Sequence, residues 1–160
     1  MSMIGNFLAI SEEKAQELRE NPSNIPDYLY SEEIQESDSY LDIDKAWNGI
    51  HFLLTGTTFG GEEPLCWVVL GGETIGEDVG YGPARFVNAK DVKTINEAIS
   101  GIDSSSLNDR FNPDELNDSE VYPSVWEQDH AEYLIGAYED VKAFYASASK
   151  NNQCVIQFIS

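Results

Sequence analysis

The chain has 160 residues, of which 41% are hydrophobic and 11% aromatic, so it suits one globular domain over residues 1–160 and is too apolar for a disordered protein. Nine Lys and Arg stand against 29 Asp and Glu, which gives a formal net charge of −20 at pH 7. This balance excludes nucleic acids and anionic membrane surfaces as partners, because both require a basic face.

The sequence contains no apolar run near the roughly 20 residues of a membrane span, and its first residues lack the layout of a signal peptide. A cytoplasmic location is therefore expected. Cys66 and Cys154 lie far apart and match no metal-binding spacing, so two buried thiols are expected rather than a disulfide or a zinc site.

The first elements follow from apolar runs and their boundaries. Residues 3–10 have the length and apolarity of a buried strand. Ser11 and the two acidic residues after it are typical of a helix start, and Pro22 ends that helix. Residues 22–40 combine two prolines with many acidic side chains, which indicates a short helical turn followed by an acidic surface connection.

The clearest element is a helix that begins near Asp42 as its cap and ends at Gly56. Its apolar positions recur at helical spacing and mark one buried face. These positions are Ile43, Ala46, Trp47, Ile50, Leu53 and Leu54.

The second half alternates short and long elements. Residues 64–70 fit either a buried strand or a short helix, and we favour the helix. A strand is expected over 84–87 and a final strand over 154–159, which we place beside the first strand in the centre of the sheet. Helices are expected from Asn88 to Gly101 and over 104–109, 113–117 and 128–149. The predicted fold is α+β, a mostly antiparallel central sheet that includes both terminal strands and packs against several helices.

His51 is the histidine with an interesting position, because it lies on or beside the buried stripe of its helix. The structural interpretation is an imidazole bonded to a carbonyl or carboxylate. His130 has no second histidine four residues away, and Asp42 and Asp44 are explained by helix capping. No metal and no cofactor are predicted.

The most unusual local string runs from Gly80 to Arg85. Glycines on both sides of Tyr81 and a proline at position 83 allow the loop to present Tyr81 and Arg85 in a defined geometry. A structural ion-pair hub is the simplest role for Arg85, and binding of a ligand carboxylate or phosphate is the alternative. The carboxylates nearby in the sequence are Glu62, Glu63, Glu73, Glu77 and Asp78.

Tyr122 and Trp126 flank Pro123, which holds the segment extended ahead of the last long helix. We expect both aromatic side chains to fold back as a lid on the core. The alternative is that they line a pocket or a partner surface.

Several strings together resemble the YfbM-like bacterial family over nearly the whole chain. That family has no established activity, so the resemblance implies a stand-alone α+β domain in a bacterial, cytoplasmic setting and assigns no catalytic residues. It also suggests that three regions are important for one shared reason. These are the region of Trp47 and His51, the region of Gly56, and the region of Tyr81 and Arg85. The strings are 3–7 (MIGNF), 41–47 (LDIDKAW) running into 51–56 (HFLLTG), 64–65 with 69–72 (VLGG), 80–85 (GYGPAR), and 122–123 with Trp126.

The sequence supports two functional hypotheses. The first is a non-enzymatic acidic protein that binds or inhibits a basic protein partner, as immunity proteins do, because the charge steers such a partner and no set of nucleophile, base and oxyanion donors can be assembled. The alternative is a small-molecule enzyme or sensor in which His51, Tyr81 and Arg85 approach one another in a pocket walled by the glycine loops. The candidate ligand-binding residues are Trp47, His51, Tyr81, Arg85, Tyr122 and Trp126.

Overall fold

The computed structural model describes residues 2–160 and contains a five-stranded sheet in the order β2-β1-β5-β4-β3. Every neighbouring pair of strands is antiparallel, and the predicted α+β class is confirmed. The strands are β1 (Gly5–Ile10), β2 (Tyr40–Asp42), β3 (Glu73–Asp78), β4 (Pro83–Val87) and β5 (Cys154–Ile159).

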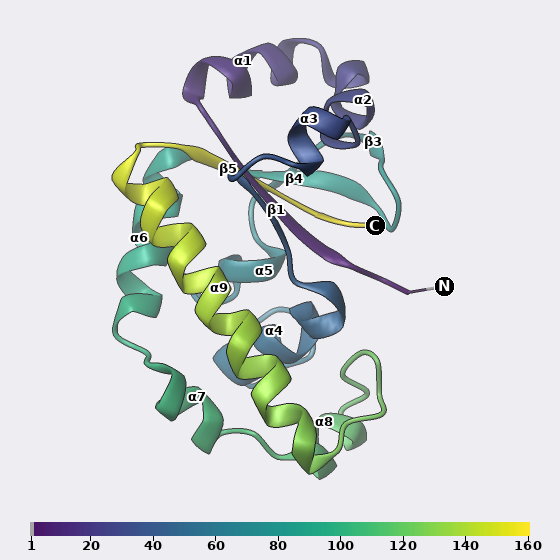
Figure 1. Ribbon diagram of the computed structural model, residues 1–160, viewed down its shortest axis with the longest axis vertical. Coiled ribbons are helices and arrows are strands. Elements are labelled where there is room, and N and C mark those ends of the chain that lie inside the picture. Colours follow the sequence, from purple (N-terminus) through teal and green to yellow (C-terminus); the bar gives the residue numbers. More distant parts are fainter. Residues whose placement is uncertain (1) are drawn as a thin grey trace.

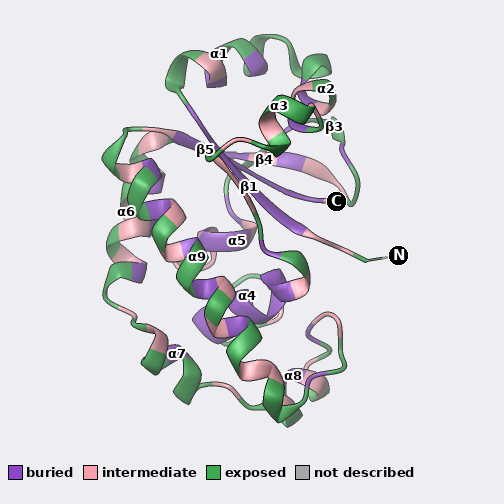
Figure 2. Ribbon diagram, viewed as in Figure 1, coloured by how far each residue is buried: buried purple, intermediate pink, exposed green. Residues whose placement is uncertain are grey.

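The two ends of the chain form the middle of the sheet. β1 and β5 pair along their full length, from Gly5 opposite Ile159 to Ile10 opposite Cys154, as the sequence predicted. Both strands are buried along their entire length (Figure 2). A strand that is covered on both faces reads as a continuous apolar run, which explains why these two were readable from the sequence.

Helices cover both faces of the sheet (Figure 1). Alternate side chains along each strand point to opposite faces, so Leu8 joins the core beneath α1–α3 and Phe7 joins the larger core beneath α4–α9. The helices are α1 (Glu12–Glu20), α2 (Ile25–Leu29), α3 (Glu32–Gln35), α4 (Trp47–Thr55), α5 (Trp67–Leu70), α6 (Ala89–Ser100), α7 (Ser104–Asp109), α8 (Pro113–Asp118) and α9 (Ala131–Lys150).

Helix α4 begins later than predicted. Asp42 is not its cap, because its Oδ1 accepts a hydrogen bond from the Asp44 backbone N–H at 2.7 Å and a tight turn over Asp44–Ala46 precedes the helix. The predicted end is confirmed: Gly56 adopts a left-handed φ of 78° and its N–H bonds to the Phe52 carbonyl. The short helix expected within 64–70 is also present as α5.

Two strands were missing from the sequence-based prediction, and both lie at the edges of the sheet. β2 has only three residues, and in β3 only Ile75 is buried. An edge strand with so little apolar surface lacks the alternation that marks a strand in a sequence, and its pairing is set by the neighbouring strand.

Among the described residues, no helix is both long and apolar enough to span a bilayer.

Candidate functional site

A cavity of about 630 Å³ lies where the start of α4, the loop after it, the loop before β4 and the segment before α9 come together. Residues near both ends of the chain and from α5 also line it, so segments that are far apart in the sequence contribute to one site. Its apolar lining includes Met3, Trp47, Leu70, Tyr122 and Ile159. Such an apolar hollow with a few polar groups is the usual form of a small-molecule site.

The aromatic wall is fixed by stacking and by hydrogen bonds. The rings of Trp47 and Tyr122 stack with their centroids 5.7 Å apart and their planes at 24°. The Trp47 Nε1–H donates to the Met3 carbonyl at 2.9 Å, and the Met3 N–H donates to the Tyr122 hydroxyl at 2.9 Å. Both predicted aromatic residues are therefore held in place by the same stretch of backbone.

Asn48, next to Trp47 on α4, joins two walls of the cavity. Its Nδ2 donates to the Thr58 carbonyl and its Oδ1 accepts from the Tyr122 N–H, both at 2.8 Å. The side chain is fully buried and lies at the cavity lining. A buried amide satisfied on both sides fixes the loop after α4 relative to the 120–124 segment.

Arg85 lines the cavity from β4 with few partners of its own. Its guanidinium makes one weak hydrogen bond, from Nη2 to the Val69 carbonyl at 3.3 Å, and its Nε is buried without any partner. Burial lowers the pKa of the Arg85 guanidinium. The group is thus a partly desolvated cation facing an apolar hollow.

The predicted ion-pair hub at Arg85 is wrong. The ion pairs of residues 2–160 are Lys14–Glu17 and Arg19–Glu73, and neither includes Arg85. Ala84 and Phe86 face the core beneath α1–α3, so alternation along β4 directs Arg85 to the opposite face, toward the Val69 carbonyl of α5. The acidic residues that the sequence places nearby are exposed to solvent instead.

His51 lies behind the cavity rather than in its lining. It is 1% exposed, and its Nε2 bonds to the carbonyl of Gly60, a lining residue, at 2.8 Å. A carbonyl can only accept, so Nε2 carries the proton, while the buried Nδ1 has no partner. Burial lowers the pKa of His51. The expected bond to a carbonyl is confirmed, and the neutral imidazole supports the Gly60 loop.

Trp126 is separated from the other candidates. It is 4% exposed, and its Nε1 donates to the Val121 carbonyl at 2.9 Å. Its backbone and the Asn117 amide exchange two hydrogen bonds of 2.9 Å. The Trp126 side chain packs in the core, as we expected of a lid residue. It also lines a separate hollow together with Tyr133.

The cavity also contains residues that sequence reasoning did not select. One is Phe59, in the glycine loop after α4, which lines the cavity and is 66% exposed. Tyr81, which the sequence did select, lines the same cavity and is 41% exposed. Among the described residues of the lining, Glu120 is the one carboxylate and Arg85 is the one cation. A single aromatic between glycines was a usable signal for Phe59, but nothing distinguishes Glu120 among so many acidic residues.

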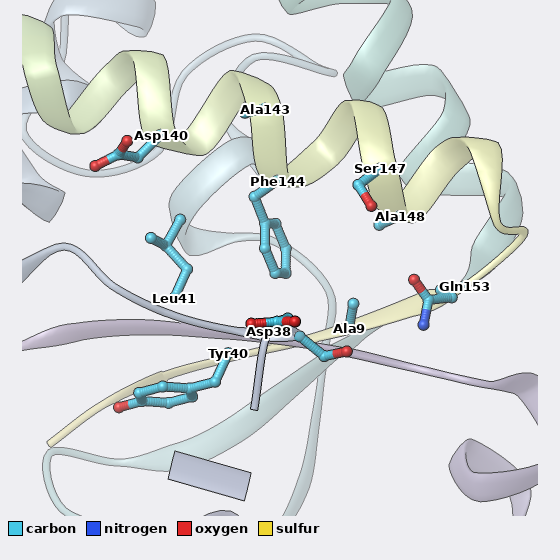
Figure 3. A pocket seen from close by; sticks show the side chains of 11 residues that line it. Ala9, Asp38, Tyr40, Leu41, Asp140, Ala143, Phe144, Ser147, Ala148 and Gln153 are labelled. Carbon is cyan, nitrogen blue, oxygen red and sulfur yellow. The ribbon is translucent and has the colours of Figure 1, made fainter. Parts of the chain in front are cut away.

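Other hollows of the described chain offer less chemistry. Between β2 and α9 lies one of about 290 Å³, with Phe144 pointing from the helix toward the strands (Figure 3). Its charged side chains, Asp38 and Asp140, are both acidic. The grouped Glu127, Asp129 and His130 side chains near the start of α9 are exposed or half-buried, and His130 Nδ1 already accepts the Glu127 N–H.

The fold and the site define a small α+β domain whose terminal strands pair at its centre and whose cavity of about 630 Å³ contains one arginine among the described residues. Residues 1–158 match the family described as "Domain of unknown function (DUF1877)", and the chain belongs to it. The family resemblance noted in the sequence is thereby confirmed.

A relative from Escherichia coli supports this assignment. The chain is 32% identical over 133 residues to "Protein YfbM" of strain K12, which covers 78% of this chain and 75% of that protein. It is similar to the crystal structure of YfbM, titled a protein of unknown function, with a TM-score of 0.74 and 28% identity. That match covers 98% of this chain and 99% of the solved one.

Proposed function

We propose that this protein binds a small molecule through an anionic group, with Arg85 as the group that holds it in the cavity. The observation that carries the proposal is that Arg85 has no carboxylate partner in a chain with 29 acidic residues and lines an apolar cavity of about 630 Å³. A guanidinium offers planar, paired donors that match carboxylates, sulfonates and phosphates.

The surroundings strengthen this argument. A partly buried cation is costly unless it is paired, so the fold retains Arg85 in an unfavourable state that an anionic ligand would relieve. The stacked Trp47 and Tyr122 rings supply an apolar wall for the rest of the ligand. The proposal develops the small-molecule hypothesis, with Tyr81 and Arg85 in the lining and His51 as support.

The aromatic sulfonate 8-anilinonaphthalene-1-sulfonate is a suitable first probe, because its fluorescence rises in an apolar site and its sulfonate fits the guanidinium. We expect the variant Arg85→Gln to weaken its binding by about tenfold or more, the value of one charged hydrogen bond. The matched control is Arg19→Gln, which removes the same charge from an exposed pair with Glu73 and should bind as the wild type does. Equal affinity of all three proteins would reject the proposal.

A second candidate function is an acidic protein that covers a basic surface of another protein. The observation in its favour is that the described chain compensates its acidic residues with only two exposed ion pairs, which leaves a strong negative field to steer a basic partner. Pull-downs from a bacterial lysate at low and high salt test it. A specific basic protein should be retained at low salt and released at high salt, and recovery of none would reject this function.

A further inference from the structure

The cavity that contains Arg85 also contains Glu120, and within residues 2–160 these two are the charged side chains that line it. Glu120 is exposed and lies just after α8, where its backbone adopts a left-handed φ of 56°. This conformation is the left-handed cap that ends α8, so the end of the helix sets where the Glu120 backbone lies.

The segment that presents Glu120 is anchored on both sides. The Glu120 N–H bonds to the Asn117 carbonyl at 3.0 Å, and the Val121 N–H bonds to the Leu116 carbonyl at 2.9 Å. Two residues later, the Tyr122 N–H donates to the buried Asn48 amide. The position of the Glu120 backbone at the cavity is therefore fixed by the core and does not depend on a mobile loop.

The two charges face one cavity without pairing. No ion pair of the described chain joins Glu120 to Arg85, so their charged atoms are more than 4.0 Å apart. A carboxylate at an arginine site repels a simple anion, in a protein that is already strongly acidic. A ligand that carries its own cation converts this repulsion into attraction, and the same carboxylate then discriminates against plain anions.

We propose that the ligand is a small zwitterion with an apolar portion, in which an anionic group meets Arg85 and an ammonium group meets Glu120. This inference rests on the proposed function and specifies its ligand class. The apolar portion packs against the stacked Trp47 and Tyr122 rings. Free amino acids with apolar side chains and short peptides share this chemistry and differ in the separation of their charges.

Calorimetric titration of the whole protein with four related probes tests the inference. L-phenylalanine and L-alanyl-L-phenylalanine carry both charges at different separations, whereas N-acetyl-L-phenylalanine lacks the ammonium and L-phenylalaninamide lacks the carboxylate. We expect the better of the two zwitterions to bind at least about tenfold more tightly than either singly charged probe. The better zwitterion then identifies the source as a free amino acid or a peptide.

Variants assign the charges to the two residues. Glu120→Gln should weaken binding of the better zwitterion by about tenfold and leave N-acetyl-L-phenylalanine equal or tighter. Arg85→Gln should weaken both. The matched control Glu97→Gln removes an exposed carboxylate of α6, away from the cavity, and should change neither.

The outcomes separate this inference from the proposed function. Binding of N-acetyl-L-phenylalanine as tight as that of the zwitterions, with no effect of Glu120→Gln, overturns the zwitterion and leaves an Arg85-dependent anion site. Absence of binding by all four probes also overturns it, even where the aromatic sulfonate binds through Arg85. If the sulfonate is indifferent to Arg85→Gln as well, both ideas fail together.

Discussion

Folding places the Arg85 guanidinium in an unfavourable environment. Its Nε is buried without a partner, and burial lowers its pKa, which means that the folded state disfavours the charged form. The charge persists at neutral pH in the folded and the unfolded chain, so its desolvation opposes folding at every working pH. A residue that lowers stability in this way is typical of a binding site.

Arg85→Met should therefore not destabilise the protein. Methionine keeps the apolar stem and removes the desolvated charge at the cost of the weak bond to Val69. We expect a melting temperature between that of the wild type and about 4 °C above it, since a gain of about 1 kcal/mol moves a domain of this size by about 2–4 °C. Thermal unfolding measures it, and a fall of several degrees would instead assign Arg85 a structural role.

His51 predicts a pH dependence of stability. Burial lowers its pKa in the folded state, so the unfolded chain binds more protons below its own value of about 6.5. The stabilising contribution is complete above about pH 6.5 and declines as the pH falls toward the folded pKa. His51→Gln keeps a donor for the Gly60 carbonyl and should reduce this loss.

Urea unfolding between about pH 5.5 and 7.5 compares the wild type with this variant. His130→Gln is the control, because it removes the other imidazole of the chain, and the wild-type decline should survive in it. The same decline in all three proteins would show that the carboxylates, and not His51, determine the pH dependence.

At the scale of elements, Asn48 couples α4 to two segments of the cavity wall. Asn48→Ala leaves the Thr58 carbonyl and the Tyr122 N–H without partners, which should lower the free energy of unfolding by about 2–4 kcal/mol. Asn108→Ala in α7 is an exposed control and should change it by less than about 0.5 kcal/mol. Denaturant unfolding measures both, and equal values would mean that the two bonds contribute nothing to stability.

The elements also show what the sequence can reveal. Helix α9 and the buried strands β1 and β5 were predictable because their apolar residues repeat or run continuously. Edge strand β3 was not, since its shape comes from pairing with β4. Tyr81 and Arg85 stood out through their glycine setting, whereas Glu120 lines the cavity because the end of α8 packs there, a tertiary position that no local pattern records.

At the scale of the whole molecule, the net charge of −20 opposes compaction. The ion pairs of residues 2–160, Lys14–Glu17 and Arg19–Glu73, are solvent-exposed and relieve little of this repulsion. Two acidic side chains, Asp38 and Asp140, line the same hollow between β2 and α9 (Figure 3). Two apolar cores on opposite faces of the sheet act against this repulsion.

Salt should therefore stabilise the protein. The screening length falls from about 30 Å at about 10 mM NaCl to less than about 8 Å at about 300 mM, so repulsion between distant carboxylates fades. We expect the melting temperature to rise by several degrees over this range. Asp140→Asn removes one of two like charges at a shared hollow, so it should raise the melting temperature at low salt and have a smaller effect at high salt. A melting temperature that is flat or falls with added NaCl would mean that the charge distribution, although strongly acidic in sum, leaves little repulsion in the folded state.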